Sequence, residues 1–294
     1  MSYRVYYPKH EENRMKNEGD VLTARKSFIK MFTEQNRTEQ NRTEQNRTEQ
    51  NRTEQNRTEH QNHVLYELLR SRFNWMNGYI YPDDENIIEV GCGAGLSKFF
   101  ITNSKLVLTD VLDNSWVDRY EDAMNLSYAD NSLDVVIASE MIHHLASPYA
   151  FFKQLESKLK PGGRIIIQDM HNSLIMKLVL RIMRHEGWDD NVNVYDKTAV
   201  CNQPDDPWSA NCSITMLLFD NKALFEKTFP DLEIIKDTKM ECFMFLFSGG
   251  VIAKGPRLPL SKSLTKLLSV VDKWCIKMLP GIFACGRSIV IRKR

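Results

Sequence analysis

Three glycines at alternate positions follow a short apolar run and could hold a nucleotide-like ligand. Residues 87–90 have the composition of a buried strand, and Gly91, Gly93 and Gly95 come directly after it. Glycine lets the chain turn tightly and lets backbone N–H groups approach a ligand closely. A second apolar run ends at Asp110, at about the 20-residue spacing by which a βαβ unit presents a carboxylate to ribose hydroxyls. We therefore predict a cofactor site at this βα turn.

Two details distinguish this loop from a dinucleotide-binding loop and from an ordinary turn. The glycines follow the pattern G-x-G-x-G, and Leu96 stands where the dinucleotide pattern has its last small residue. Glu89 is an acid inside an otherwise apolar strand, a placement that requires a partner for the carboxyl group. Glycines also serve turns that bind nothing, so the prediction depends on the rest of the chain.

Further blocks occur downstream of the glycine loop. They are Asp122-Ala123, Leu126-Ser127-Tyr128, residues 130–136, His143-His144-Leu145 and residues 159–164. With these blocks, in their order and spacing, the chain from residue 87 onward resembles the class I S-adenosylmethionine-dependent methyltransferases. The blocks are specific for the cofactor and carry little information about the acceptor of the methyl group.

The resemblance implies that S-adenosylmethionine is the cofactor and that a defined set of residues binds it. These are Glu89, Gly91, Cys92, Gly93, Gly95, Asp110, Val111, Asp122, Ala123, Ser139 and Glu140. Glu89 would orient the loop or the amino group of the cofactor, Asp110 would accept hydrogen bonds from the ribose hydroxyls, and Asp122 from the adenine amino group. Ser139 and Glu140 would lie near the reacting methyl group.

Transfer of a sulfonium methyl group needs little acid–base machinery. The methyl group is already activated, so the protein mainly has to hold the acceptor close and in line. For a hydroxyl acceptor a base helps, and the candidate catalytic residues are His144, His171 and His143. Two adjacent histidines that open a helix are not expected to face the site together. No group of acids and histidines has metal-ligand spacing along the sequence, so no metal is expected.

The elements that must position these residues alternate between strand and helix. The patterns predict helices at 64–76, from about 94, at 148–159, 174–184 and 222–229, and strands at 86–91, 105–110, 133–138, 164–169, 232–235 and 282–291. This alternation predicts an α/β fold: a Rossmann-like doubly wound sheet, mostly parallel, with helices on both faces. The resemblance implies an antiparallel last strand. Pro161-Gly162-Gly163 is expected to form the turn that stops a helix and aims the fifth strand.

Two long segments interrupt the alternation within residues 61–294, which we assign to the methyltransferase-like domain. An insertion at about 171–218 is rich in turn formers and aromatic residues. It either lies over the carboxyl ends of the strands, where the acceptor should bind, or is a packed surface excursion. The second segment, at about 247–280, belongs to a basic C-terminal region.

Residues 254–294 form the only strongly charged region, with ten basic residues and one acid, Asp272. Its larger apolar residues share one helical face: Leu267, Leu268, Val271, Trp274 and Met278. Such a helix either packs on the core with a solvated basic face or lies on an anionic membrane surface. RNA binding is disfavoured because aromatic residues are not interleaved with the basic ones as base recognition requires.

The N-terminal part has a different character. After a segment at 1–32, the pentapeptide Thr-Glu-Gln-Asn-Arg repeats from Thr33 through Arg57, and the repeat region spans 33–60. It contains no apolar residue and cannot bury a face, so we expect disorder or a solvated helix. The repeat either serves as a spacer or partner-binding arm or has no specific role.

Composition limits the setting of the protein. The chain has 294 residues, 42% of them apolar, and a net charge of +1, so it can build a core but has no global field that would attract nucleic acid. The six cysteines show no metal-ligand pairing and the N-terminus has no apolar stretch of a signal peptide, which favours a cytoplasmic setting. No apolar run approaches the roughly 18 residues needed to span a bilayer, so only peripheral contact at the inner membrane face stays open.

The sequence therefore favours an enzyme that methylates a small or medium-sized acceptor, by O-methylation of a sugar or a lipid-linked precursor. Two other classes stay open. A non-catalytic scaffold protein of the same fold is disfavoured by the intact glycines and Asp110, and an NAD-dependent oxidoreductase by Leu96 and the antiparallel ending. The expected partner is a small-molecule, saccharide or lipid-linked acceptor, nucleic acid is disfavoured, and the oligomeric state is open.

Overall fold

The computed structural model describes residues 62–183, 186–250 and 256–294. The segment at 1–32 and the pentapeptide repeat at 33–60 lie outside these residues, so our expectation for the repeat stays a prediction. All the elements below belong to one unit of the chain, Thr48–Arg294.

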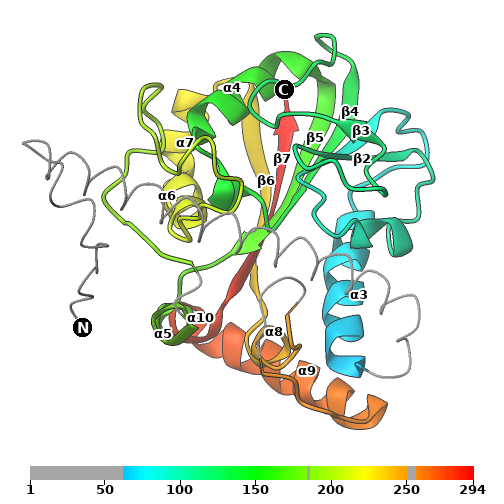
Figure 1. The fold of residues 1–294 in the computed structure, drawn as a ribbon, viewed down its shortest axis with the longest axis vertical. Helices are drawn as coiled ribbons and strands as arrows, with labels where there is room; N and C mark the ends of the chain where they lie inside the picture. Colours follow the sequence, from blue (N-terminus) through cyan, green and yellow to red (C-terminus); the bar gives the residue numbers. More distant parts are fainter. Residues whose placement is uncertain (1–61, 184–185, 251–255) are drawn as a thin grey trace, which may run out of the picture. The chain divides into compact units, whose positions relative to one another are not determined.

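Within the described residues, seven strands form one sheet in the order β3-β2-β1-β4-β5-β7-β6 (Figure 1). The strands are β1 Ile87–Val90, β2 Leu106–Asp110, β3 Arg119–Tyr120, β4 Leu133–Ser139, β5 Leu159–Met170, β6 Leu232–Met240 and β7 Gly286–Lys293. The first five pair in parallel, whereas β7 runs antiparallel to both β5 and β6. β1 is buried along its whole length, as a parallel strand covered on both faces must be. The predicted Rossmann-like sheet with an antiparallel last strand is confirmed.

Helices cover both faces of this sheet. They are α3 His63–Asn77, α4 Pro148–Lys158, α5 Leu174–Met183, α6 Ile214–Phe219, α7 Lys222–Thr228, α8 Phe243–Leu246, α9 Lys262–Met278 and α10 Pro280–Phe283, with 3-10 turns η1 Leu96–Phe99 and η2 Ile142–His144. On one face Phe152 of α4 contacts Phe219 of α6 and Phe225 of α7 edge to face. On the other face α3 buries its apolar stripe against β1, β2 and β4. The two apolar layers hold the carboxyl ends of the parallel strands together.

The helix expected from about residue 94 is reduced to the single 3-10 turn η1. Gly95 precedes it in a left-handed conformation, with a φ of +61°. Beyond it, the side chain of Asn77 at the end of α3 donates to the carbonyl of Phe100 and accepts from the N–H of Thr102. These side-chain bonds replace the backbone bonds that a longer helix would need.

Two boundaries near the sheet also differ from the prediction. Pro161-Gly162-Gly163 lies within β5, whose pairing with β4 shifts register between Leu133 and Val135, so these residues form a bulge rather than a turn before the strand. Residues 282–285 do not belong to the last strand, because α10 precedes β7 and begins with a proline, which suits the first turn of a helix.

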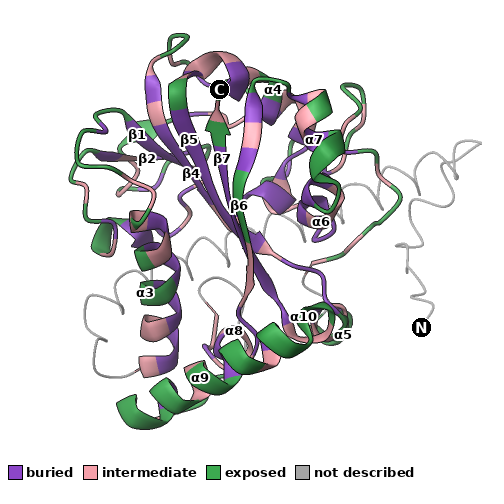
Figure 2. Cartoon of the chain, turned by 180° about the vertical axis from the view of Figure 1, so that it is seen from behind, coloured by how far each residue is buried: buried purple, intermediate pink, exposed green. Residues whose placement is uncertain are grey.

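The helices α5, α10 and α9 follow one another near the end of the sheet where β5 ends and β7 begins, at the bottom of both views (Figures 1 and 2). A small apolar cluster joins them to the sheet, with Met176 and Leu180 from α5 and Ile276 from α9. Among the residues that the structure describes, none of the helices is both long and apolar enough to cross a bilayer.

Candidate active site

The glycine loop lies at the carboxyl end of β1. Gly91, Gly93 and Gly95 have φ angles of +62°, +51° and +61°, which residues with a side chain rarely adopt. A Cβ atom on Gly91 would lie 2.4 Å from the Cγ of Met141, which follows β4. The loop therefore needs glycine at position 91 both for its conformation and for the close approach of Met141.

Asp110 ends β2 beside the loop and fixes its shape. Its Oδ2 accepts a hydrogen bond from the N–H of Gly93 at 2.8 Å, and its Oδ1 accepts one from the N–H of Leu112 at 2.9 Å. Burial raises the pKa of Asp110, and these backbone bonds oppose the rise. Each carboxylate oxygen has a second lone pair, so the group retains acceptor capacity for a ligand hydroxyl.

Glu89 is 2% exposed and has the partner that its buried position requires. The hydroxyl of Ser97, in η1, is hydrogen bonded to its Oε2. Burial raises the pKa of Glu89 to about 8; the Ser97 bond opposes this shift and the charge of Asp110 adds to it. Glu89 therefore carries a proton at neutral pH and ties the strand to the loop. Its expected contact with a cofactor stays a prediction.

The other residues expected to bind the cofactor lie at the same edge of the sheet or next to it. Asp122 Oδ1 accepts a hydrogen bond from the N–H of Met124 at 2.8 Å, and the carbonyl of Ala123 accepts one from the side chain of Gln154. Three further residues lie at or just beyond the ends of β1, β2 and β4, respectively: Cys92, Val111 and Ser139. The structure thus brings the predicted set to the carboxyl ends of the parallel strands, where open α/β sheets bind ligands.

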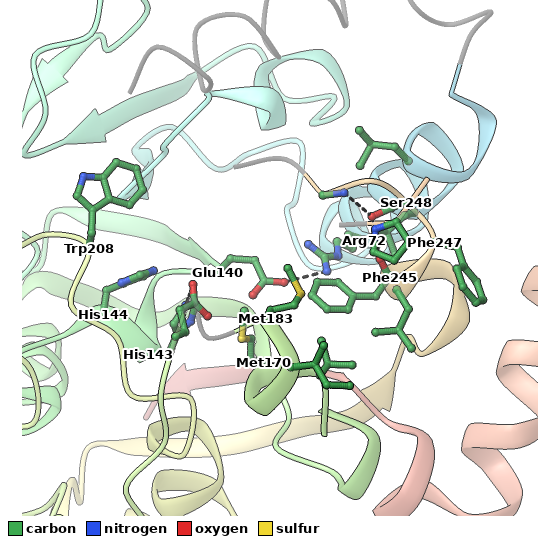
Figure 3. Close-up of a pocket in the computed structure, with 18 residues that line it drawn as sticks. Arg72, Glu140, His143, His144, Met170, Met183, Trp208, Phe245, Phe247 and Ser248 are labelled. Carbon is green, nitrogen blue, oxygen red and sulfur yellow. Dashed lines mark hydrogen bonds and ion pairs between the residues drawn. The ribbon is translucent and has the colours of Figure 1, made fainter. Parts of the chain in front are cut away.

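A pocket of about 380 Å³ lies next to the carboxyl end of β4 (Figure 3). Its apolar wall comes from α3, from α5, from the α8 region and from the segment before α6, with Leu65, Leu68, Val179, Ile182, Phe245 and Trp208 among its residues. Five charged or titratable side chains line the pocket as well: Arg72, Glu140, His143, His144 and Glu186. The pocket therefore suits a molecule with an apolar body and one polar group.

Arg72 of α3 and Glu140 form the centre of the polar lining. Arg72 Nη2 lies 2.8 Å from Glu140 Oε1, and its Nε and Nη2 donate to both carboxylate oxygens of Glu241 at 2.7 and 2.5 Å. Burial raises the pKa of Glu140 to about 7, although the charge of Arg72 opposes the rise. The Oε2 of Glu140 has no hydrogen-bond partner among the described residues. One oxygen of Glu140 is thus held by Arg72 and the other is available to a ligand.

His143, in η2, forms a buried pair with Asp169 near the end of β5. The Nδ1 of His143 lies 2.6 Å from Asp169 Oδ1, and the two side chains are 1% and 0% exposed. Burial alone would lower the pKa of His143, but the charge of Asp169 and its hydrogen bond raise it well above the ordinary value. The Nε2 has no hydrogen-bond partner among the described residues, and Glu186 Oε1 is 3.9 Å away.

His144 also lines the pocket, so the expectation that only one of the two adjacent histidines faces the site is wrong. Its Nδ1 lies 3.1 Å from the carbonyl of Ser209, which can only accept, so Nδ1 carries the proton and Nε2 is an acceptor. Burial and the neighbouring His143 lower the pKa of His144 to about 4. The rings lie 4.1 Å apart in the single turn of η2, and the bond to Ser209 turns His144 toward the insertion.

His171, the third candidate base, is buried and is not part of the lining of this pocket. The backbone N–H of His171 donates a hydrogen bond to the backbone carbonyl of Cys285, beside the start of β7. Burial and the charges of Lys239 and Arg287 lower the pKa of His171 to about 4. The structure therefore favours the adjacent pair over His171.

The fold creates two overlapping sets of metal-ligand types that the sequence did not reveal. Ligand atoms of His143, His144 and Glu186 lie within 4.8 Å of one another, as do those of Glu140, His143 and Asp169. Acids and histidines have no metal-ligand spacing along the sequence, but the fold brings some of them together in space. In the second set Arg72 already compensates Glu140, and His143 compensates Asp169, so we keep the prediction that no metal is required.

Comparison with known proteins gives one family match and several relatives. A family model described as a methyltransferase domain matches residues 58–206, about half of the chain. The 27-O-demethylrifamycin SV methyltransferase of Amycolatopsis mediterranei is 29% identical over 104 residues, which cover 29% of this chain and 38% of the relative. The 2-methyl-6-phytyl-1,4-hydroquinone methyltransferase of a Synechocystis species is 32% identical over 122 residues, or 35% and 37% of the two chains.

A further relative has an acceptor of a different kind in its name. Phosphoethanolamine N-methyltransferase 1 of Arabidopsis thaliana is 29% identical over 102 residues, which cover 29% of this chain and 21% of the relative. The chain spans less than two fifths of the length of each of these three relatives.

Proposed function

The chain belongs to the methyltransferase domain family, and we propose that it transfers a methyl group from S-adenosylmethionine to a hydroxyl group on an acceptor with a large apolar body. The observation that carries the proposal is the apolar pocket with Glu140, His143 and His144 in its lining. A free sugar would place many hydroxyls against apolar walls, each at a cost in lost hydrogen bonds. Of the two acceptor kinds expected from the sequence, the lipid-linked one fits better.

The loop at the end of β1 fits the proposed cofactor. The main chain of Gly91–Gly95 would hold its methionine portion, Asp110 would accept hydrogen bonds from the ribose, and Asp122 from the adenine amino group. The positive φ angles of Gly91, Gly93 and Gly95 give the loop a conformation that favours glycine, and the absence of side chains at these positions is compatible with close approach of a ligand to the backbone. When bound, S-adenosylmethionine would supply an electrophilic methyl group.

His143 is the residue to which we assign removal of the acceptor proton. Its Nε2 is buried at the pocket and has no hydrogen-bond partner within the described part of the chain, and Asp169 fixes the ring by holding Nδ1. When the acceptor oxygen takes the methyl group, the S–CH3 bond would break and neutral S-adenosylhomocysteine would leave. The hydroxyl proton would pass to Nε2, and the charge of Asp169 would stabilise the resulting imidazolium. The neutral His144, with Nε2 as an acceptor, would orient the same hydroxyl. Of the three candidates from the sequence, His144, His171 and His143, we thus assign the base to His143.

The relatives support an apolar acceptor without defining it. Two are named for a rifamycin and for a phytyl-substituted hydroquinone. The relative named for phosphoethanolamine represents the opposite case, since a phosphate would need a cation at the pocket. Arg72 supplies a positive charge at the pocket, but it already forms ion pairs with Glu140 and Glu241.

Binding and transfer measurements on the full chain test the proposal in two stages. Calorimetric titration should show binding of S-adenosylmethionine and S-adenosylhomocysteine but not of NAD. A chain that is folded yet binds neither sulfur compound would be a scaffold protein instead. Binding of NAD alone would indicate the oxidoreductase class.

The second stage follows radioactive methyl transfer to three acceptors: a phenol with a long alkyl or isoprenyl chain, free glucose and phosphoethanolamine. We expect label in the alkylated phenol only, and transfer to phosphoethanolamine alone would overturn the assignment of the pocket. His143→Gln should abolish transfer and leave binding of S-adenosylhomocysteine intact. His171→Gln serves as the matched control and should retain transfer, because His171 is not in the lining of the pocket.

A further inference from the structure

The helix α9 turns its largest apolar side chains toward solvent. Thr265, Asp272 and Ile276 form its buried face. On the opposite side six apolar residues are between 42% and 64% exposed and share about a third of the helix circumference: Leu264, Leu267, Val270, Val271, Trp274 and Met278. We call these six the outer stripe of α9. Figure 2 shows exposed residues along the length of this helix.

This finding argues against one of the two arrangements that the sequence left open for the basic region. A helix that packs on the core with a solvated basic face would bury Leu267, Val271 and Trp274, which are instead 59%, 42% and 64% exposed. A continuous apolar stripe of this size on a surface marks a site of contact with another apolar phase.

The charges along the outer stripe have one sign. Lys262, Lys266, Lys273 and Lys277 are all exposed and follow one border of the stripe at helical spacing. The single acid of the helix, Asp272, is buried and accepts hydrogen bonds from the N–H groups of Cys242 and Phe243 at 3.1 and 2.6 Å. An apolar stripe bordered by lysines, without an exposed acid on the helix, complements an anionic lipid surface rather than an apolar protein patch.

A second stripe lies on α5, which contacts α10, the helix that follows α9. Leu174, Leu178 and Ile182 are four residues apart and are 65%, 56% and 71% exposed. Ile182 also lines the pocket of the proposed active site, together with Val179 and Met183. The exposed apolar surface of α5 is therefore continuous with the apolar wall of that pocket.

We propose that the outer stripe of α9 and the exposed stripe of α5 bind the surface of an anionic phospholipid bilayer, and that the apolar acceptor enters the pocket from the bilayer past Ile182. The lysines contact lipid phosphates while Leu267, Trp274 and the other stripe residues insert among the acyl chains near the head groups. The route of the acceptor rests on the proposed function, whereas the attachment to lipid does not.

Vesicle flotation with the full chain tests the attachment directly. The protein should float with vesicles that contain about one third phosphatidylglycerol, and much less with vesicles of phosphatidylcholine alone. Raising the salt concentration should weaken the binding, because lysine–lipid attraction is screened. Lys266→Glu combined with Lys273→Glu should reduce the affinity for anionic vesicles at least about 20-fold, since each lysine contributes about five-fold.

Leu267→Ser combined with Trp274→Ser removes apolar contact and should also abolish flotation. The control, Leu224→Ser combined with Ile235→Ser, changes two apolar residues on α7 and β6 that are 40% and 41% exposed, and it should float like the unchanged protein. Circular dichroism and binding of S-adenosylhomocysteine should be the same for all variants, which separates loss of attachment from loss of folding.

Two results would overturn the proposal. One is flotation that survives both the apolar and the charge variants. The other is a protein that binds no vesicles but forms a dimer, seen by light scattering, which the Leu267→Ser and Trp274→Ser changes dissociate. A second copy of the chain would then be the occupant of the stripe.

For the route of the acceptor, Ile182→Glu should slow transfer to an acceptor embedded in vesicles at least ten-fold more than transfer to the same acceptor in detergent micelles. Equal slowing in both would overturn the route alone, and absence of transfer from any acceptor would count against the proposed function instead.

Discussion

The Nδ1 of His143 lies 2.6 Å from the Oδ1 of Asp169, and both side chains are almost completely buried. A second hydrogen bond fixes the carboxylate of Asp169, because its Oδ1 also accepts from the backbone N–H of Met170. The charge and hydrogen bond of His143 lower the pKa of Asp169, although burial opposes this, so the carboxylate stays ionised. The pair holds the imidazole in one orientation, with Nε2 as its remaining polar atom.

Replacing Asp169 by Asn should change the pH dependence of transfer. Because Asp169 raises the pKa of His143, the neutral imidazole that can accept a proton forms only well above the ordinary histidine range, and transfer should rise with pH up to that point. Asp169→Asn removes the charge, so the rising limb should move to lower pH. The maximal rate should fall about 100-fold or more because the imidazolium loses its counter-charge. The measurement is kcat/KM between pH 6 and 10.

The matched control for this variant is Asp190→Asn. Asp190 is an exposed acid of the insertion, and its hydrogen bond to Ser213 lowers its pKa. Its replacement should leave the pH profile unchanged. An Asp169→Asn enzyme whose profile keeps the position of the unchanged protein would contradict the role of His143.

Asp110→Ala should weaken binding of S-adenosylhomocysteine at least about ten-fold without unfolding the domain. The change removes the acceptor expected for the ribose and leaves the N–H groups of Gly93 and Leu112 without their partner, at about 1–3 kcal/mol for a buried donor. Calorimetric titration gives the affinity and thermal melting gives the stability. The exposed Asp113→Ala, three residues on, is the control, and equal affinities of the two variants would show that the ribose binds elsewhere.

The fold could be predicted because its signals are local in the sequence. The strands β1, β2 and β4 are mostly apolar, as buried parallel strands require, and α3 has the periodicity of a helix that covers one face. Errors arose where side chains override backbone preference. Asn77 ends η1 by binding Phe100 and Thr102, a contact between distant segments that no local pattern contains.

The site was only half predictable for the same reason. The glycine loop and Asp110 are adjacent elements of one βαβ unit, whereas Arg72, Asp169 and Glu186 come from three different parts of the chain. Arg72 did carry a signal, because it interrupts the apolar stripe of its helix, and a buried cation needs an acid. Glu186 carried none, since its place beside His143 depends on the path of the insertion.

Glu89 should make the folded protein less stable as the pH rises. The folded state keeps the proton of Glu89 until about pH 8, whereas the unfolded chain loses it near the ordinary glutamate pKa of about 4.3. Above that lower value the unfolded state binds fewer protons, so the free energy of unfolding should decline between about pH 4.3 and 8, by about 5 kcal/mol in all, and then level off. Urea unfolding at pH 5.5 and 8.5 measures the decline.

Glu89→Gln should remove most of this decline, because glutamine has no proton to lose and can still hydrogen bond to Ser97. The control is Glu85→Gln, which changes an exposed glutamate just before the same strand and should keep the decline of the unchanged protein. A Glu89→Gln protein with the same difference between the two pH values would show that Glu89 is ionised in the folded state.

Removal of divalent metal should leave methyl transfer unchanged. Arg72 already pairs with Glu140, Asp169 is hydrogen bonded to His143, and the assigned proton acceptor is the His143 imidazole, which needs no metal. Transfer is measured before and after dialysis against EDTA, then with added magnesium, manganese or zinc. A loss that one of these ions reverses would assign His143, His144 and Glu186 to a metal site.

Gly91→Ala should destabilise the domain and weaken cofactor binding together. The added Cβ would lie 2.4 Å from the Cγ of Met141, and an alanine at a φ of +62° costs about a further 1 kcal/mol. The melting temperature of Gly91→Ala should therefore fall by several degrees. Adding Met141→Ala to it removes the collision but not the backbone strain, so the double variant should lose less stability than the sum of the two single variants. Strict additivity would mean that Met141 moves aside freely and that the loop does not depend on this contact.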